Sequence, residues 1–111
     1  MAQTRVVIDC RKITDSESFH EVFASTFGFP EFYGRTMDAW IDCFAHLDDP
    51  LDTMTTVHAP KGGMLVIHLK HVEDFAGRCP ELYNDLLECA AFVNCRRILE
   101  GYDQVLSLTF H

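Results

Sequence analysis

The stretch FPEFYGRTMDAWIDC, residues 29–43, joins an aromatic loop to an amphipathic helix, and the fold is built on either side of it. Pro30 and Gly34 enclose two adjacent aromatic residues, a composition typical of a loop. From Thr36, a predicted N-cap, apolar residues recur every three or four positions and predict a helix that ends near residues 48–50. The apolar stripe of this helix consists of Met37, Trp40, Ile41, Phe44 and Leu47.

The residues before this stretch predict one strand and one helix. Residues 5–9 contain three consecutive β-branched side chains, too few for a helix, and predict a short buried strand. Thr14 and Glu17 have the spacing of a capping box, and apolar residues then recur at helical spacing over residues 19–27. Gly28 suits a left-handed end to that helix.

Residues 48–63 have the least regular pattern. A stretch this long without structure exceeds the usual loop length, which indicates either a functional loop or an unrecognised element. The β-branched residues within 53–57 predict a short edge strand there. Residues 64–69 form the clearest strand in the sequence.

The remaining residues predict a helical turn, a long helix and a last strand. The turn covers residues 73–78, and Pro80 suits the first position of a helix that runs to about Glu100 and is closed by Gly101. Residues 105–110 alternate between apolar and polar side chains, as expected of a strand.

The order of these elements predicts an α/β fold. Strands separated by helical crossovers should be parallel, so we expect a three-stranded parallel sheet packed against a layer of helices. The chain has 111 residues, which predicts a single domain over residues 1–111.

The charge of the chain restricts its partners. Seventeen acidic and nine basic residues give a formal net charge of −8, which argues against direct binding to nucleic acid or to an anionic membrane. A basic partner is the expectation. The N-terminal residues lack the apolar core of a signal peptide, and no stretch is apolar enough to span a membrane, which predicts a cytoplasmic protein. The five cysteines fit buried, reduced thiols.

Motifs for catalysis and for metal binding are weak. No cysteine has a local signature that pairs it with a histidine, and the sequence contains no nucleophile elbow, P-loop or dinucleotide fingerprint. His68 and His71 are the only close histidine pair, and they have too few companion ligands for zinc. We therefore expect no catalytic residue, no metal site and no cofactor.

Two acidic residues stand out on the helix after the aromatic loop. Asp38 and Asp42 are four residues apart, so both carboxylates lie on one helix face, opposite the apolar stripe. Such a pair is either a solvated acidic face or part of a binding surface. Phe32 and Tyr33, next to Gly34, favour an interaction surface, where aromatic residues are enriched. The same aromatic residues could instead pack the loop onto the core.

The segment of residues 29–43 resembles the barstar family of intracellular ribonuclease inhibitors. The shared features are Pro-Glu, two aromatic residues and glycine, followed by a helix with Asp-Ala-x-x-Asp-Cys, here Asp38 to Cys43. The resemblance extends back to the first predicted strand and, more weakly, forward to the last one. Residues 48–63 look like an insertion relative to the family pattern. It implies the barstar-like fold, which the order of elements supports independently.

The resemblance also implies a binding mode. In barstar-like inhibitors the loop and helix plug a ribonuclease active site, and carboxylates stand where RNA phosphates would lie. Asp42 would then be the deepest phosphate mimic and Asp38 a second ion-pairing group. Gly34 would allow close approach of the backbones, and Phe32 would pack on the active site of the nuclease. The implied partner is a basic ribonuclease or another basic toxin protein.

Several positions depart from the family pattern. Phe32 replaces a tyrosine, Thr36 an asparagine, and Ile41 and Leu47 each replace a tryptophan, while Arg96 stands at a position that is acidic in the family. These changes keep the carboxylates and alter the rim of the surface. The predicted partner-binding residues are Phe32, Tyr33, Gly34, Thr36, Asp38, Ile41 and Asp42.

Two alternatives to a ribonuclease inhibitor stay open at the level of the sequence. The first is a barstar-fold module that binds a different basic toxin or a regulatory partner without inhibiting a ribonuclease. The second is a thiol or metal enzyme built from cysteine and histidine residues. Phe92 falls among acidic residues of the long helix and marks either self-association or a more buried helix. We expect the free protein to be a monomer.

Overall fold

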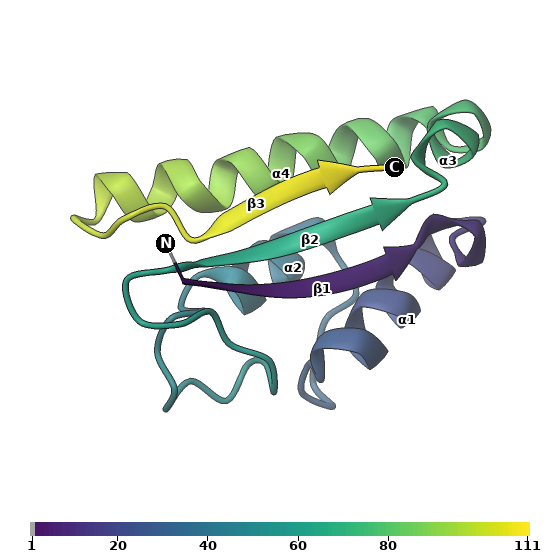
Figure 1. The fold of residues 1–111 in the computed structure, drawn as a ribbon. Coiled ribbons are helices and arrows are strands. Elements are labelled where there is room, and N and C mark those ends of the chain that lie inside the picture. Colours follow the sequence, from purple (N-terminus) through teal and green to yellow (C-terminus); the bar gives the residue numbers. More distant parts are fainter. Residues whose placement is uncertain (1) are drawn as a thin grey trace.

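The computed structural model describes residues 2–111 and contains a three-stranded parallel sheet in the order β1-β2-β3. The strands are β1 (Gln3–Asp9), β2 (Met64–Lys70) and β3 (Leu106–Phe110). The helices are α1 (Ser16–Phe27), α2 (Met37–Phe44), α3 (Val72–Arg78) and α4 (Pro80–Leu99), with a short 3-10 helix η1 (Cys10–Lys12) after β1. The predicted α/β class and the parallel sheet are confirmed (Figure 1).

The helices α1, α2 and α4 lie on one side of the sheet (Figure 1). Alternate strand residues such as Ile8, Ile67 and Leu69 are almost fully buried on that side, as the two-residue repeat of a strand requires. Aromatic side chains from α1 and α2 fill the space between the layers. Those that are fully buried are Phe19, Phe23, Phe27, Trp40 and Phe44.

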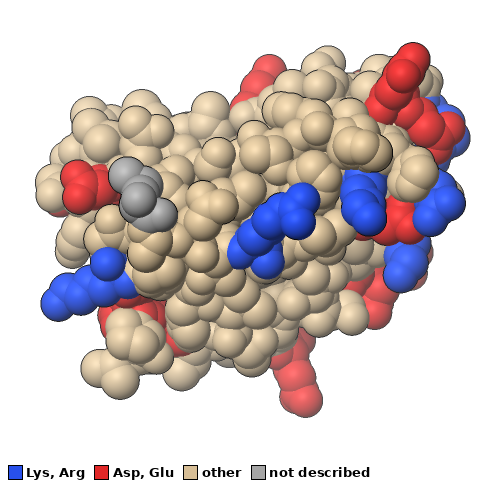
Figure 2. All heavy atoms as spheres, in the orientation of Figure 1, with Lys and Arg blue, Asp and Glu red and all other residues tan. Residues whose placement is uncertain are grey.

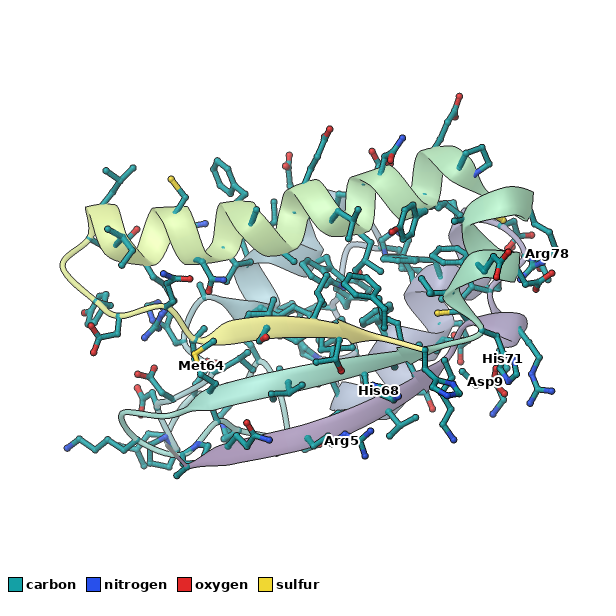
Figure 3. All side chains as sticks on the ribbon, turned by 45° about the horizontal axis from the view of Figure 1, so that its top comes forward. Arg5, Asp9, Met64, His68, His71 and Arg78 are labelled. Atoms are coloured by element: carbon teal, nitrogen blue, oxygen red, sulfur yellow. The ribbon has the colours of Figure 1, made fainter. Side chains whose placement is uncertain are left out.

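Among residues 2–111, no helix covers the opposite face of the sheet (Figure 1). Arg5 and His68 lie on this face (Figure 3), and His68 Nδ1 is 2.7 Å from the hydroxyl of Thr109 on the neighbouring strand. Figure 2 shows this side of the molecule as mostly uncharged, with one basic side chain near its centre and both basic and acidic side chains at its margins. The excess of negative charge therefore belongs mainly to other parts of the surface.

The ends of α1 confirm one prediction and correct another. Gly28 adopts the left-handed conformation with φ of 67°, as expected of a helix C-terminus. The N-cap is Asp15 and not Thr14: the Asp15 carboxylate accepts from the backbone N–H of Ser18 at 2.8 Å, and the Ser18 hydroxyl accepts from the N–H of Asp15 at 3.0 Å. This reciprocal pair replaces the expected contact of Glu17, because the shorter serine already satisfies the Asp15 N–H.

The segment 48–63 contains no strand, so the prediction of an edge strand at 53–57 is wrong. The backbone N–H of Thr56 donates to the carbonyl of Phe27 at 2.8 Å, at the C-terminus of α1. It therefore does not pair with a strand of the sheet. The hydroxyl of Thr55 donates to the carbonyl of Val57 at 2.8 Å, which closes a local turn. The segment thus packs as an irregular loop against the end of α1.

The helices α2 and α4 form where the sequence predicts helices, and their ends differ from the prediction to different degrees. Pro80 occupies the first turn of α4, which ends at Leu99, one residue before the predicted end. By contrast, α2 ends at Phe44, short of the predicted end near residues 48–50. Leu47 is nevertheless fully buried, so the apolar stripe continues into the turn after α2.

Candidate functional site

The loop before α2 directs its two aromatic residues in opposite directions. The ring of Tyr33 lies 4.7 Å from the ring of Phe29, and its hydroxyl is 2.5 Å from Nδ1 of the buried His20. Phe32 is 78% exposed. Of the two alternatives for this pair, Tyr33 therefore packs the loop onto α1, and Phe32 is the aromatic residue offered to solvent.

Burial keeps both partners of this hydrogen bond neutral. Burial raises the pKa of Tyr33 above its usual range, and burial followed by the positive charge of Arg35 lowers the pKa of His20. This hydrogen bond between two neutral groups, one of them on α1, holds the loop against α1. Tyr33 is consequently a residue that positions the loop.

Gly34 and Arg35 complete the loop with different steric requirements. A Cβ added at Gly34 would meet only the methyl group of Ala39 at 3.6 Å, which is ordinary van der Waals contact. The free fold thus does not require glycine at this position. Arg35 adopts a left-handed conformation with φ of 52°, and its guanidinium donates to Glu21 at 2.9 Å. This ion pair draws the positive charge of Arg35 toward α1.

The two acidic residues of α2 lie on its exposed side, as predicted. Thr36 caps the helix by accepting from the backbone N–H of Ala39 at 3.1 Å, which is the role the sequence predicted for it. Asp38 lies in the first turn and Asp42 one turn later, and both are exposed. The cap and the helix backbone therefore place the two carboxylates at fixed positions beside the loop.

Ile41 is the most buried of the predicted partner-binding residues. Its side chain is only 8% exposed and belongs to the hydrophobic core, as its place on the predicted apolar stripe indicates. The residue follows Trp40 in the sequence and lies with it on the buried face of α2. Ile41 consequently has little surface to offer to a partner, and its effect on binding would come through the packing of α2.

A small hollow of about 180 Å³ joins the loop to α2. Its lining residues are Phe32, Tyr33, Gly34, Ala39, Asp42, Cys43 and Met54. Met54 comes from the irregular segment 48–63, which the sequence could not place. The lining combines apolar side chains with one carboxylate, Asp42, and such a lining can accept a side chain with an apolar stem and a positively charged head.

The carboxylate of Asp42 has an internal partner that was not foreseen. Arg96 of α4 donates from Nη1 to Asp42 Oδ1 at 3.0 Å and from Nε to Glu100 Oε1 at 3.3 Å. The Arg96 side chain is 39% exposed and that of Asp42 60% exposed, so water screens the pair. The two carboxylates raise the pKa of Arg96, Asp42 first. The sequence flagged Arg96 as a departure in charge, but its contact with Asp42 depends on how α4 packs against α2.

Acidic residues from two helices gather around the thiol of Cys89. Burial raises the pKa of this thiol, and the carboxylates of Asp85, Glu88 and Asp38 raise it further. Asp85 and Glu88 belong to α4, whereas Asp38 belongs to α2. The negative potential of the site therefore extends from α2 onto α4.

The next arginine along α4, Arg97, is buried and holds α2 and α4 together. Arg97 is 2% exposed and donates to the carbonyl of Ala45 at 2.8 Å and to the carbonyl of Asp103 at 2.7 Å. It also pairs with Asp48 at 2.9 Å. Ala45 is the residue directly after α2, so Arg97 satisfies a carbonyl at the C-terminus of that helix and fixes α2 against α4.

The buried thiols of Cys10 and Cys43 have raised pKa values. Burial raises the pKa of Cys10 to about 11 and that of Cys43 to about 12, which keeps both thiols protonated and unreactive at neutral pH. Within residues 2–111, no group of three or more histidine, cysteine, aspartate or glutamate side chains could hold a metal ion. His68 and His71 do not converge with further ligands. In the same range no helix is long and apolar enough to cross a membrane.

Comparison with known families agrees with this geometry. Residues 3–108 match the family described as Barstar (barnase inhibitor), which is nearly the whole chain. The chain belongs to the barstar family. No match to a curated protein was found. Barstar is a family of inhibitors and not of enzymes, and the sheet and helices described above have the α/β arrangement expected of a barstar-like fold.

Proposed function

We propose that this protein is a non-enzymatic inhibitor that binds a basic ribonuclease and blocks its active site with the surface formed by the loop and α2. The observation that carries the proposal is the placement of Asp38 and Asp42 on the exposed side of a capped helix, beside the exposed ring of Phe32. Membership of the barstar family supports the same conclusion.

The proposed mechanism is competition for phosphate-binding groups. A ribonuclease cleft holds RNA phosphates with arginine, lysine and histidine side chains, and a carboxylate can take the same hydrogen bonds and charge. Thr36 and the helix backbone hold Asp42 in place before binding, so little entropy is lost when the complex forms. Asp38 would supply a second ion pair, and Phe32 would cover the cleft.

Gly34 and the net charge have supporting roles in this mechanism. Because nothing in the free fold requires glycine at position 34, its lack of a side chain fits close approach of a partner's backbone. A net charge of −8 would speed the encounter with a basic enzyme. Direct binding to RNA is disfavoured by the same charge. We further propose that the protein acts in the cytoplasm and is a monomer when free.

The proposal predicts that Asp42→Ala weakens the complex most. The change removes the carboxylate and leaves guanidinium or ammonium groups of the partner buried without a counter-charge, so we expect a loss of about 3 kcal/mol, or more than about 100-fold in Kd. Calorimetry with basic ribonucleases, beginning with the barnase that the family description names, measures this loss, and an RNA-cleavage assay measures inhibition.

Glu17→Ala is the matched control for this experiment. It also removes one negative charge, but from the exposed first turn of α1. We expect it to change Kd by less than about threefold, through long-range attraction alone. Equal losses for Asp42→Ala and Glu17→Ala would reject the phosphate-mimic assignment.

A second candidate is supported by the ion pair between Asp42 and Arg96. A protein-binding module for another basic toxin or regulatory partner would use the same surface without inhibiting a ribonuclease. Capture of the native partner from the host, followed by an RNA-cleavage assay on that partner, separates the two candidates. A captured basic protein without ribonuclease activity would favour the second.

A further inference from the structure

The carboxylate proposed as the phosphate mimic is already matched with a positive charge. Arg96 Nη1 lies 3.0 Å from Asp42 Oδ1, and no carboxylate other than Glu100 shares this arginine among residues 2–111. A cationic group of a partner that approaches Asp42 therefore meets a second cation beside it. This arrangement runs against the simplest form of phosphate mimicry.

The side chain of Arg96 can turn away from Asp42, but its backbone stays in place on α4. The pair is exposed and therefore weak, so a partner can replace Arg96 on Asp42. Glu100, one helical turn further along α4, already accepts from Nε of the same guanidinium. The adjacent Arg97 is anchored by buried hydrogen bonds to Ala45 and Asp103, which fixes the backbone of α4 at this point. The backbone of Arg96 is therefore held beside Asp42, and only its side chain is free to turn.

The charges along this part of the surface consequently differ in sign. Asp85 and Glu88 precede Arg96 along α4 and Glu100 follows it, while Asp42 of α2 lies against Arg96. A cleft lined only by cations would be attracted by the carboxylates and repelled at Arg96. A cleft that carries a carboxylate at its rim would match both signs, because like-charge contacts are what exclude incorrect partners.

We propose that Arg96 determines which ribonucleases this surface accepts. The inference rests on the proposed function and names its partner more closely: a basic ribonuclease whose rim carries a carboxylate opposite Arg96. On binding, the partner's cation takes over Asp42 and the partner's carboxylate takes over Arg96, so that two ion pairs replace one. Ribonucleases with a uniformly cationic cleft are bound more weakly, and Arg96 is the reason.

The test uses barnase as the probe and varies only the charge at position 96. Arg96→Gln removes the positive charge and keeps a hydrogen-bonding side chain of similar shape, whereas Arg96→Glu reverses the charge. We expect Arg96→Gln to bind barnase about 10-fold more tightly than the unchanged protein does, and Arg96→Glu to bind it at least as tightly as Arg96→Gln. The gain should shrink as salt increases, since it is electrostatic.

Lys12→Glu is the matched control, because it makes the same change in net charge as Arg96→Glu at an exposed position in η1. We expect it to alter Kd by less than about threefold. Urea unfolding of each variant checks that the fold is retained. If Arg96→Glu is destabilised by the neighbouring Asp42 and Glu100, Arg96→Gln alone still decides the question.

The outcomes separate this inference from the function on which it rests. Unchanged or weaker binding by Arg96→Gln overturns the inference, and so does a failure of both variants and the unchanged protein to bind barnase. An equal gain from Lys12→Glu also overturns it, because the effect would then be one of net charge.

The proposed function fails instead if Asp42→Ala leaves binding to a ribonuclease unchanged. Loss of binding in Asp42→Ala without a gain in Arg96→Gln rejects only the role of Arg96.

Discussion

The contact between α2 and α4 has a buried side and an exposed side, and consecutive arginines of α4 hold them. On the buried side, Arg97 makes hydrogen bonds to the carbonyls of Ala45 and Asp103 and is almost completely shielded from water. On the exposed side, Arg96 pairs with Asp42, which is more than half exposed. The two arginines have the same chemistry and a similar number of partners, yet burial gives them different roles.

The difference follows from the cost of removing polar groups from water. A buried carbonyl or carboxylate that loses its partner cannot regain a hydrogen bond from solvent, whereas an exposed one can. The buried side of the contact therefore stabilises the fold and positions α2. The exposed side contributes little to stability and is free to exchange its partners for those of another protein. The following predictions test this division.

The largest expected effect is that of Arg97→Met. The change keeps an apolar stem of similar length and removes the guanidinium, which leaves two carbonyls and Asp48 without their donor. We expect the free energy of unfolding to fall by about 3 kcal/mol, measured by urea denaturation. The matched change Arg96→Met should cost less than about 0.5 kcal/mol. Equal costs for the two substitutions would break the comparison.

An intermediate effect is expected at the aromatic pair of the loop. Tyr33→Phe removes the hydroxyl that pairs with the buried His20, so the imidazole loses its partner and the free energy of unfolding should fall by about 1–2 kcal/mol. Phe32→Ala, on the exposed side, should change stability by less than about 0.5 kcal/mol and weaken binding to the ribonuclease. Thermal or urea unfolding measures the first effect, and calorimetry the second. A stable Tyr33→Phe variant would show that the inward contact is dispensable.

The smallest effect on stability is expected for Gly34→Ala. The added methyl group meets only Ala39 at ordinary contact distance, so unfolding should be unchanged within about 0.5 kcal/mol, while binding weakens because the partner's backbone can no longer approach. Gly28 should behave in the opposite way, since a Cβ there would lie 2.3 Å from Thr56 Oγ1 in a left-handed backbone conformation. Destabilisation by Gly34→Ala would mean that this glycine serves the fold.

Much of the fold could be predicted because it depends on local patterns. The strand at 64–69, the cap at Thr36 and the left-handed end at Gly28 each follow from the residues on the spot. The cap of α1 was misplaced by one residue because Thr14 and Asp15 are both good caps, and only the backbone conformation selects between them. The strand predicted at 53–57 failed because β-branched residues also suit loops whose backbone bonds are taken up elsewhere.

The candidate site was predictable in part for the same reason. The helical repeat places Asp38 and Asp42 on one side of α2, away from the core, without any knowledge of the rest of the chain. The repeat also places Ile41 on the apolar stripe, but it could not decide how much of that side chain stays exposed, because that depends on how wide a face the neighbouring elements cover. It also could not choose which of Phe32 and Tyr33 turns inward, since the choice depends on the presence of His20 on α1.

The sequence by itself determined the parallel α/β order, the acidic helix face and the excess of negative charge, because these properties depend on residue type and on spacing along the chain. Only the tertiary structure decided what the acidic face contains. Asp42 and Arg96 are 54 positions apart in the sequence, as are Thr4 and His58, which meet through a hydrogen bond of 2.9 Å. Such contacts form when separate helices and loops pack on a shared core, and packing of that kind leaves no periodic trace in the chain. The tertiary structure thus converts two exposed acids into a surface that carries both signs of charge.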